Sequence, residues 1–277
     1  MLDDIYMEGR LNEMDDLAFL LHFKEYEEAN QDIYFGYQSP NSEELSYLRQ
    51  ALHLEEIAGE GSELKRISRL RNWVYKSLKS EGEQFYDKSE FNSKTWNTLT
   101  ILKEMQRKPF LADCGTTALV MTEVLLAMGW KARWIQCLPM DLRFNESHCI
   151  SHVWSRDYEK WIIVDAAQDL FYFNSHAVPY GLPDLRQAIL NKDRLLIYSN
   201  LKKIEGQKWL QQYWVKNIFR FHCLKESCFS MFGSDVLEHY YLNPKDYNIA
   251  DKVIEINGQK HIHTHVCDSG AYWEVCV

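Results

Sequence analysis

The stretch Asp113-Cys114-Gly115-Thr116-Thr117-Ala118-Leu119-Val120-Met121 decides the fold of this 277-residue chain. A short polar loop leads into it, and the apolar run that follows ends at Gly129. Aspartate is a favoured helix N-cap, and glycine often follows the last residue of a helix. The pattern therefore predicts a buried helix over residues 114–128, with Cys114 in its first turn.

The first turn of a helix is a favourable place for a reactive cysteine. The free N–H groups and the positive end of the helix dipole favour thiolate over thiol. A free cysteine taken alone is more often a buried core residue. A histidine and an aspartate that follow in chain order favour a nucleophile at Cys114 instead.

The elements around this helix predict an α+β fold. Apolar spacing indicates helices over residues 11–29, 43–57 and 62–78, and another that begins at Ser93 and ends before Pro109. Strands are predicted over 131–137, 148–155 and 161–166, with residues 156–159 as the tight connection between the last two. One helix, one strand and an antiparallel hairpin in succession differ from a βαβ repeat.

The C-terminal part has three predicted features. Residues 183–192 form a helix, and the aromatic, basic stretch 208–222 packs in the core rather than lining a ligand site. The tail is a β meander, with a two-residue hairpin turn at Asn257-Gly258 and another turn at residues 268–270. We expect three parts: an N-terminal helical segment (1–61), a catalytic core (62–200) and a C-terminal aromatic and β extension packed on the core (201–277).

Two histidines compete to be the base that activates Cys114. His148 and His152 are four residues apart on one predicted strand, so they share a face but lie ~13 Å apart along it. If Trp154 pairs with Trp161, Asp165 on the next strand is diagonal to both histidines. Periodicity therefore allows either histidine to be the base.

The block from Asp113 to Asp165 resembles the core of the transglutaminase-like superfamily, which has a papain-like fold. The matching features are Cys114 at a helix start, the segment 129–133 leading into a strand, a His-x-x-x-x-x-Trp strand and a Trp-x-x-x-Asp strand. The resemblance implies a Cys-His-Asp triad in that chain order. In the family the histidine usually stands six residues before an aromatic residue, which selects His148 over His152.

Further similarity extends to a bacterial branch of this superfamily, in which a Cys-x-Pro-x-Asp stretch precedes the histidine; here it is residues 137–141. Two positions depart from the family pattern: His152 stands where an acid is usual, and Asp165 is followed by two alanines rather than Pro-Thr. The side chain of the oxyanion hole is left open among Trp73, Trp96 and Gln106.

Composition excludes several partners. The net charge is −9, so no basic stripe is available for nucleic acid. No apolar run of about 18 residues predicts a membrane span. The first residues lack the pattern of a secretory signal, and seven cysteines without close pairing fit reduced thiols, so we expect a cytoplasmic protein unless a signal was removed.

Three histidines, His261, His263 and His265, alternate along the tail and would point to one face. Because the sequence specifies no acid or fourth ligand beside them, a solvated strand face is favoured over a metal site. We therefore expect no metal and no cofactor.

The sequence thus predicts a thiol enzyme that attacks a peptide-type amide through Cys114, His148 and Asp165. The implied substrate is a peptide, a protein or a small amide. The acyl group would pass to water, as in a peptidase or amidase, or to an amine, as in an acyltransferase. The alternative is a transglutaminase-like binding or scaffold protein without turnover.

Overall fold

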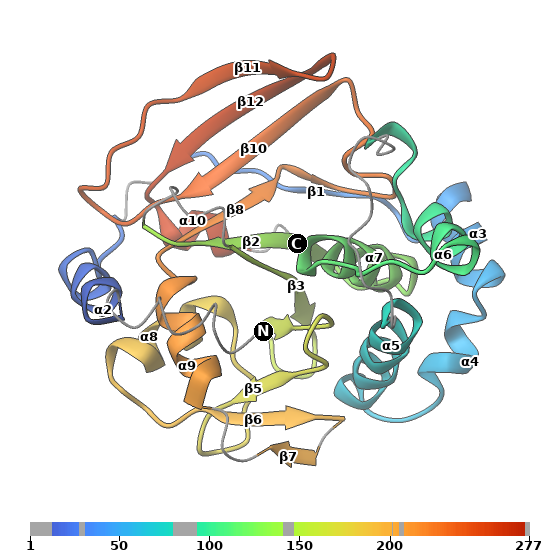
Figure 1. Cartoon of the computed structure of the whole chain (residues 1–277), viewed down its shortest axis with the longest axis horizontal. Helices are drawn as coiled ribbons and strands as arrows, with labels where there is room; N and C mark the ends of the chain where they lie inside the picture. The colour runs from blue at the N-terminus through green and yellow to red at the C-terminus, as the bar shows by residue number, and fades with distance from the viewer. Residues whose placement is uncertain are drawn as a thin grey trace.

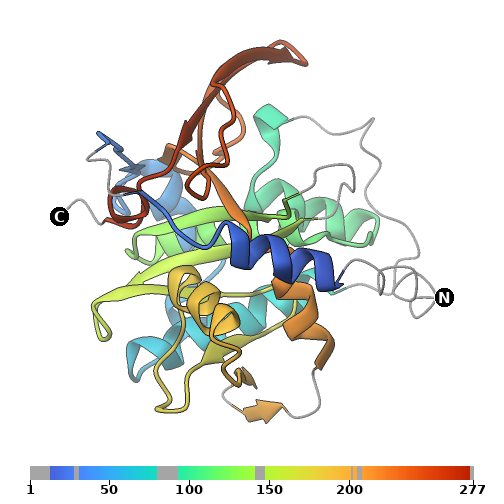
Figure 2. The same cartoon turned by 90° about the vertical axis from the view of Figure 1, so that its left-hand side faces the viewer.

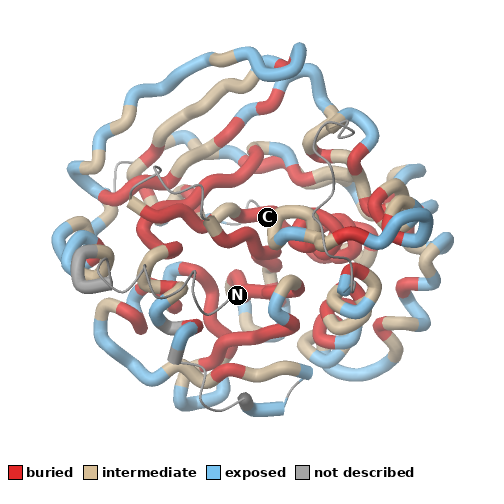
Figure 3. The backbone as a smooth tube through the Cα atoms, in the orientation of Figure 1, coloured by how far each residue is buried: buried red, intermediate tan, exposed pale blue. Residues whose placement is uncertain are grey.

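A seven-stranded mixed sheet forms the centre of the computed structural model, which describes residues 13–27, 31–79, 93–140, 147–200, 202–204 and 208–274. The strand order is β11-β12-β10-β8-β2-β3-β4 (Figure 1). The strands are β2 (Ala132–Leu138), β3 (His148–Ser155), β4 (Lys160–Val164), β8 (Arg220–Leu224), β10 (Val236–Leu242), β11 (Lys252–Ile256) and β12 (Gln259–Val266). Strands β2 and β3 are almost wholly buried (Figure 3), as expected for the middle of a two-sided core.

The predicted cysteine helix is α7 (Cys114–Ala127), which packs on β2 and β3. The Asp113 carboxylate accepts a hydrogen bond from the Thr116 N–H at 2.7 Å, which confirms the N-cap. Gly129 follows the helix with a φ of 86°, a conformation that favours glycine. Helices α3 (Glu43–Ala51), α5 (Glu63–Leu78) and α6 (Thr98–Arg107) pack against α7 (Figure 1).

The opposite side of the sheet is covered by α2 (Glu13–His22), α8 (Leu182–Leu190) and α9 (Lys208–Lys216) (Figure 1). Their apolar side chains form a second core that contains Leu20, Leu185 and Trp214. The aromatic stretch 208–222 is divided between α9 and β8; Trp214, Phe219 and Phe221 lie in the core as expected, whereas Trp209 is exposed. The strands β5 (Phe171–Phe173), β6 (Leu196–Ser199) and β7 (Lys202–Ile204) form a separate small sheet.

Several predicted elements differ from the observed ones for local reasons. The helix expected over 43–57 is divided into α3 and α4 (Leu54–Ala58), because His53 adopts a left-handed φ of 51°. The helix expected from Ser93 is only a short 3₁₀ turn over Ser93–Thr95, and α6 begins after Asn97, whose side chain caps it. The predicted turn at 268–270 is the start of α10 (Ser269–Trp273), capped by Asp268. The helix expected over 11–29 ends at His22, and residues 11, 12, 28 and 29 of that range lie outside the described residues.

The C-terminal strands join the same sheet as the core strands, and their order departs from a simple meander. Strand β8 pairs with β2, and β10 runs parallel to β12, with β11 at the edge. The segment between β10 and β11 passes the C-terminal end of β12, so β11 runs back at the edge and β12 lies between β11 and β10. The strands β10 to β12 project beyond the helical layers (Figure 2). A two-stranded sheet of β1 (Gly36–Tyr37) and β9 (Glu226–Ser227) adds a link between distant segments. The expected division at residues 61 and 200 stays a prediction.

None of the helices in the described ranges is both long and apolar enough to cross a bilayer.

Candidate active site

Cys114 lies at the N-terminus of α7, beside the start of β3. Its side chain is half-buried, and its sulfur lies 3.8 Å from the carbonyl oxygen of Ser147. The first residues of a helix have N–H groups without intrahelical acceptors, so the backbone N–H of Cys114 can bind an anion that forms beside the sulfur.

His148 and Asp165 come together across the β3–β4 hairpin. The observed register pairs His152 with Ile163 and Trp154 with Trp161, as expected. Asp165 directly follows β4, and its backbone bridges to Leu170 in both directions, at 2.9 and 3.2 Å. This bridge fixes the carboxylate, whose Oδ2 lies 2.9 Å from Nε2 of His148.

The Asp165 carboxylate is fully buried and held by further donors. The Tyr172 hydroxyl donates to Oδ2 at 2.9 Å, and the Gln168 N–H donates to Oδ1 at 3.1 Å. Aromatic rings of α9 pack edge-on against the imidazole of His148: Tyr213 at 5.2 Å and Trp214 at 5.3 Å between ring centroids. The imidazole is therefore held between a fixed carboxylate and two rings.

The thiolate of Cys114 and the imidazolium of His148 stabilise each other. A hydrogen bond from the Cys149 side chain lowers the pKa of Cys114; burial opposes this, and contact with His148 lowers it further, to about 5. Burial disfavours a charged imidazole, but the Asp165 carboxylate and the Cys114 sulfur outweigh it and raise the pKa of His148 to about 10. A thiolate and an imidazolium are thus the stable forms at pH 7.

Cys149 is a part of the site that sequence reasoning missed. It is buried on β3 next to His148, and contact with Cys114 together with burial raises its pKa well above the ordinary value. It therefore stays a thiol and can donate its S–H to the Cys114 sulfur. The alternation of side chains along β3 puts Cys149 on the face toward α7, and this alternation could have indicated from the sequence that Cys149 lies near Cys114.

His152, the other candidate base, is not brought to Cys114. Its ring stacks on Trp161 at 5.3 Å, and its Nε2 accepts a hydrogen bond from the Leu182 N–H at 3.2 Å. Burial, with the positive charges of Arg133 and Lys160, lowers its pKa well below the ordinary value. His152 is thus a neutral residue of the core beneath α8.

The oxyanion-hole side chain stays unassigned among the three considered. Trp96 packs against Phe110 at 6.3 Å between ring centroids, and Gln106 is exposed on α6. Trp73 lies at the edge of the core around α7.

The alternating histidines of β12 are half-buried rather than solvated. His261 and His263 lie close to His239 of β10, and within the described ranges these three form the one group with metal-ligand spacing. The prediction that this face is solvated is therefore wrong. Its side chains are half-buried, because β10 and β8 carry histidines and Tyr241 on the same face.

Residues 51–166, which contain Cys114, His148 and Asp165, match the model of the transglutaminase-like superfamily. This stretch is therefore similar to the transglutaminase-like superfamily, as the resemblance predicted. No curated protein matched the sequence.

Two solved structures are similar over part of their length. One is a cysteine-protease candidate from Cytophaga hutchinsonii, at 18% identity and a TM-score of 0.33; the match covers 56% of this chain. The chain spans 47% of the length of that protein. The other is LapG of Legionella pneumophila, treated with EGTA, at 14% identity and a TM-score of 0.29, covering 47% of this chain and 72% of LapG.

Proposed function

We propose that the chain is a thiol-dependent acyl-transfer enzyme that attacks a peptide-type amide. Cys114 is the nucleophile, His148 the general acid and base, and Asp165 the group that orients the imidazole. The observation that carries the proposal is the bond between Nε2 of His148 and Asp165, at 2.9 Å, because it leaves Nδ1 for the Cys114 sulfur. A nucleophile, its base and an orienting acid in this order are the parts that covalent catalysis needs.

The proposed reaction has two halves. The Cys114 thiolate attacks the amide carbon and forms a C–S bond, while the developing oxyanion is held by the backbone N–H at the start of α7. The His148 imidazolium gives its proton to the departing amine as the C–N bond breaks, which leaves a thioester. Water or a second amine then attacks the thioester carbon and gives a proton to His148, and Cys114 leaves as thiolate.

A hollow of about 190 Å³ beside the site could hold the acyl group of a substrate, which supports the proposal. Ala112 and Thr117 line it on the Cys114 side, Ala166 and Ala167 follow Asp165, and Leu78 and Leu111 add apolar walls. We propose that it receives an apolar side chain of a peptide substrate. Lys79 also lines the hollow and would contact a polar or acidic residue of the substrate beside that side chain. The cytoplasmic location stays a prediction.

The test is labelling by iodoacetamide at pH 6, with each modified cysteine identified by mass spectrometry. We expect Cys114 to react first, and Cys114→Ala to remove this labelling. Cys228→Ala is the matched control, because Cys228 is also half-buried but burial raises its pKa to about 11. Equal labelling of several cysteines in the unmodified protein would contradict an activated Cys114.

A second experiment separates turnover from binding. A peptide-amide library is incubated with the protein, with and without a primary amine, and products are identified by mass. Cleaved peptides indicate a hydrolase, and amine adducts indicate a transferase. If the peptide binds tightly and Cys114 is reactive but neither product forms, the proposed enzymatic turnover is contradicted and a binding protein is indicated.

A further inference from the structure

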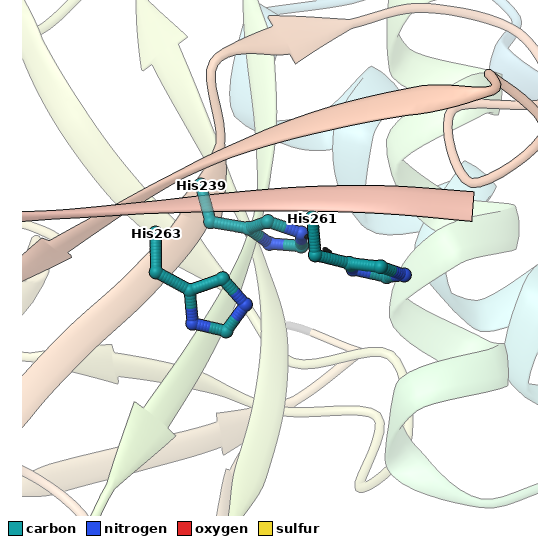
Figure 4. Close-up of side chains that lie close together, drawn as sticks. All are labelled: His239, His261 and His263. Atoms are coloured by element: carbon teal, nitrogen blue, oxygen red, sulfur yellow. Dashed lines mark hydrogen bonds between the residues drawn. The ribbon is translucent and has the colours of Figure 1, made fainter. Parts of the chain in front are cut away.

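We propose a zinc site on the projecting strands, formed by His239 of β10 with His261 and His263 of β12. This site is distinct from the candidate active site and does not depend on the proposed function. Their three ligand nitrogens lie within 4.8 Å of one another. Figure 4 shows the rings of His239 and His261 side by side, with His263 next to them.

The strand register explains why the rings meet. In the parallel β10–β12 pair, His239 stands opposite His263, and Leu237 stands opposite His261, two residues away on the same face. Nε2 of His239 already lies 3.0 Å from Nδ1 of His261. Tetrahedral zinc with Zn–N bonds of about 2.0–2.1 Å needs nitrogens about 3.4 Å apart, so this pair needs almost no movement.

The third ligand is within reach. The largest separation in the group, 4.8 Å, exceeds the tetrahedral value by about 1.4 Å, which rotation of a half-buried imidazole can supply. The ring of His263 stacks on Tyr241 at 5.1 Å and is half-buried, so it can turn without opening the core. Three imidazoles leave the fourth position of the ion to water or another small ligand.

A chain of hydrogen bonds sets the tautomer of His239 for this purpose. The Gln136 carbonyl oxygen accepts from Nδ1 of His222 at 3.0 Å, so Nε2 of His222 carries the lone pair. That lone pair accepts from Nδ1 of His239 at 2.8 Å, which leaves the lone pair of His239 on Nε2, toward His261. An outer residue that fixes the ring and tautomer of a ligand is the usual surrounding of a metal-bound histidine.

Zinc replaces the hydrogen bond between His239 and His261 without loss of a proton. In the metal-free form Nδ1 of His261 donates to Nε2 of His239. With zinc bound, both of these nitrogens coordinate the ion, and His261 carries its proton on Nε2.

The chemistry of the ligands selects the metal. Neutral imidazoles suit zinc and its neighbours in the first transition row, whereas calcium and magnesium require carboxylate and carbonyl oxygens. The charged group that acts on His263 is Lys252 of β11, a cation, so affinity comes from coordination and not from net charge. The site would join the parallel strands β10 and β12.

The experiment is a titration of the full chain with zinc alone, against a chromogenic zinc indicator. The variants His261→Asn and His263→Asn each remove one ligand from a half-buried position, and circular dichroism checks that both fold. The matched control is His265→Asn, because His265 is on the same strand and face but bonds Asn243 at 3.0 Å. Cys114→Ser reports zinc bound at the active-site thiol.

We expect one zinc ion to bind the unmodified protein, the control and Cys114→Ser with equal affinity. Affinity should fall about tenfold or more in His261→Asn and in His263→Asn. Substituted cobalt should show tetrahedral visible bands without a thiolate charge-transfer band. Unchanged affinity in both ligand variants, loss of binding in Cys114→Ser, or equal competition by calcium would each overturn the site.

Discussion

Nε2 of His148 lies 2.9 Å from Oδ2 of Asp165, and this bond decides which ring nitrogen is left for Cys114. The carboxylate is itself fixed by Tyr172 and Gln168, so the imidazole cannot turn without breaking several buried contacts. The geometry of the site therefore begins at the end of β4, at a residue that the Trp-x-x-x-Asp pattern marks in the sequence.

Asp165→Asn should weaken the thiolate. An amide carries no charge to stabilise the imidazolium, so the pKa of His148 falls and that of Cys114 rises. About half of Cys114 is thiolate at pH 5, so a rise of one unit in its pKa leaves about fivefold less thiolate, and alkylation of Cys114 at this pH should slow by at least this factor. Asp184→Asn is the control, because it removes the charge paired with Lys160 and keeps an oxygen that can accept the Gly181 N–H. An equal rate in Asp165→Asn and the control would exclude Asp165 as the orienting group.

The two histidines should separate by reactivity and stability. His148→Ala should abolish low-pH alkylation of Cys114, because the imidazolium that stabilises the thiolate is lost. His152→Ala should keep most of it but reduce the free energy of unfolding by up to about 3 kcal/mol, because a buried ring stacked on Trp161 is removed. Alkylation rates and urea denaturation of both variants check this. The reverse pattern would transfer the role of base to His152.

Cys149→Ala should raise the pKa of Cys114. A hydrogen bond to a charged group contributes about 1.5–3 kcal/mol, so we expect a rise of about one to two pH units. The measurement is the pH dependence of Cys114 alkylation. Cys223→Ala is the control, since Cys223 is equally buried but bonds the Tyr272 hydroxyl. An unchanged titration in Cys149→Ala would show that the adjacent thiol does not support the thiolate.

The Arg71–Asp169 ion pair should be important for stability. Nε of Arg71 lies 2.9 Å from Oδ1 of Asp169, and both side chains are buried. Asp169→Ala leaves a buried guanidinium uncompensated, which costs about 3–5 kcal/mol in the free energy of unfolding. Glu238→Gln at the more exposed Lys225 pair should cost at most about 1 kcal/mol. Urea denaturation compares them; similar losses would contradict the distinction.

The local parts of the fold could be predicted from the sequence because each rests on neighbouring residues. The Asp113 cap, the strand 148–155 and the Trp154–Trp161 register all follow from spacing within one element or one hairpin. The start of α6 was placed too early, because Ser93 and Asn97 are both good caps and only tertiary contacts choose between them.

The contacts that could not be predicted join distant segments. His222, His239 and His261 meet because β10 pairs in parallel with β12 and antiparallel with β8, and no spacing within one strand reveals that arrangement. For the same reason periodicity could not choose between His148 and His152, and only the family resemblance favoured His148. Both share a face of β3, and only the position of the α7 N-terminus along that strand separates them.

The rate of Cys114 alkylation against pH, followed by mass spectrometry, tests the central claim most directly. A thiol whose pKa is lowered ionises at lower pH, so the rate should rise around pH 5 and be nearly constant from about pH 6 to 8. His148→Ala should move this rise toward the ordinary thiol range, which lies at about 8.5. A rise near that value in the unmodified protein would contradict the thiolate–imidazolium pair.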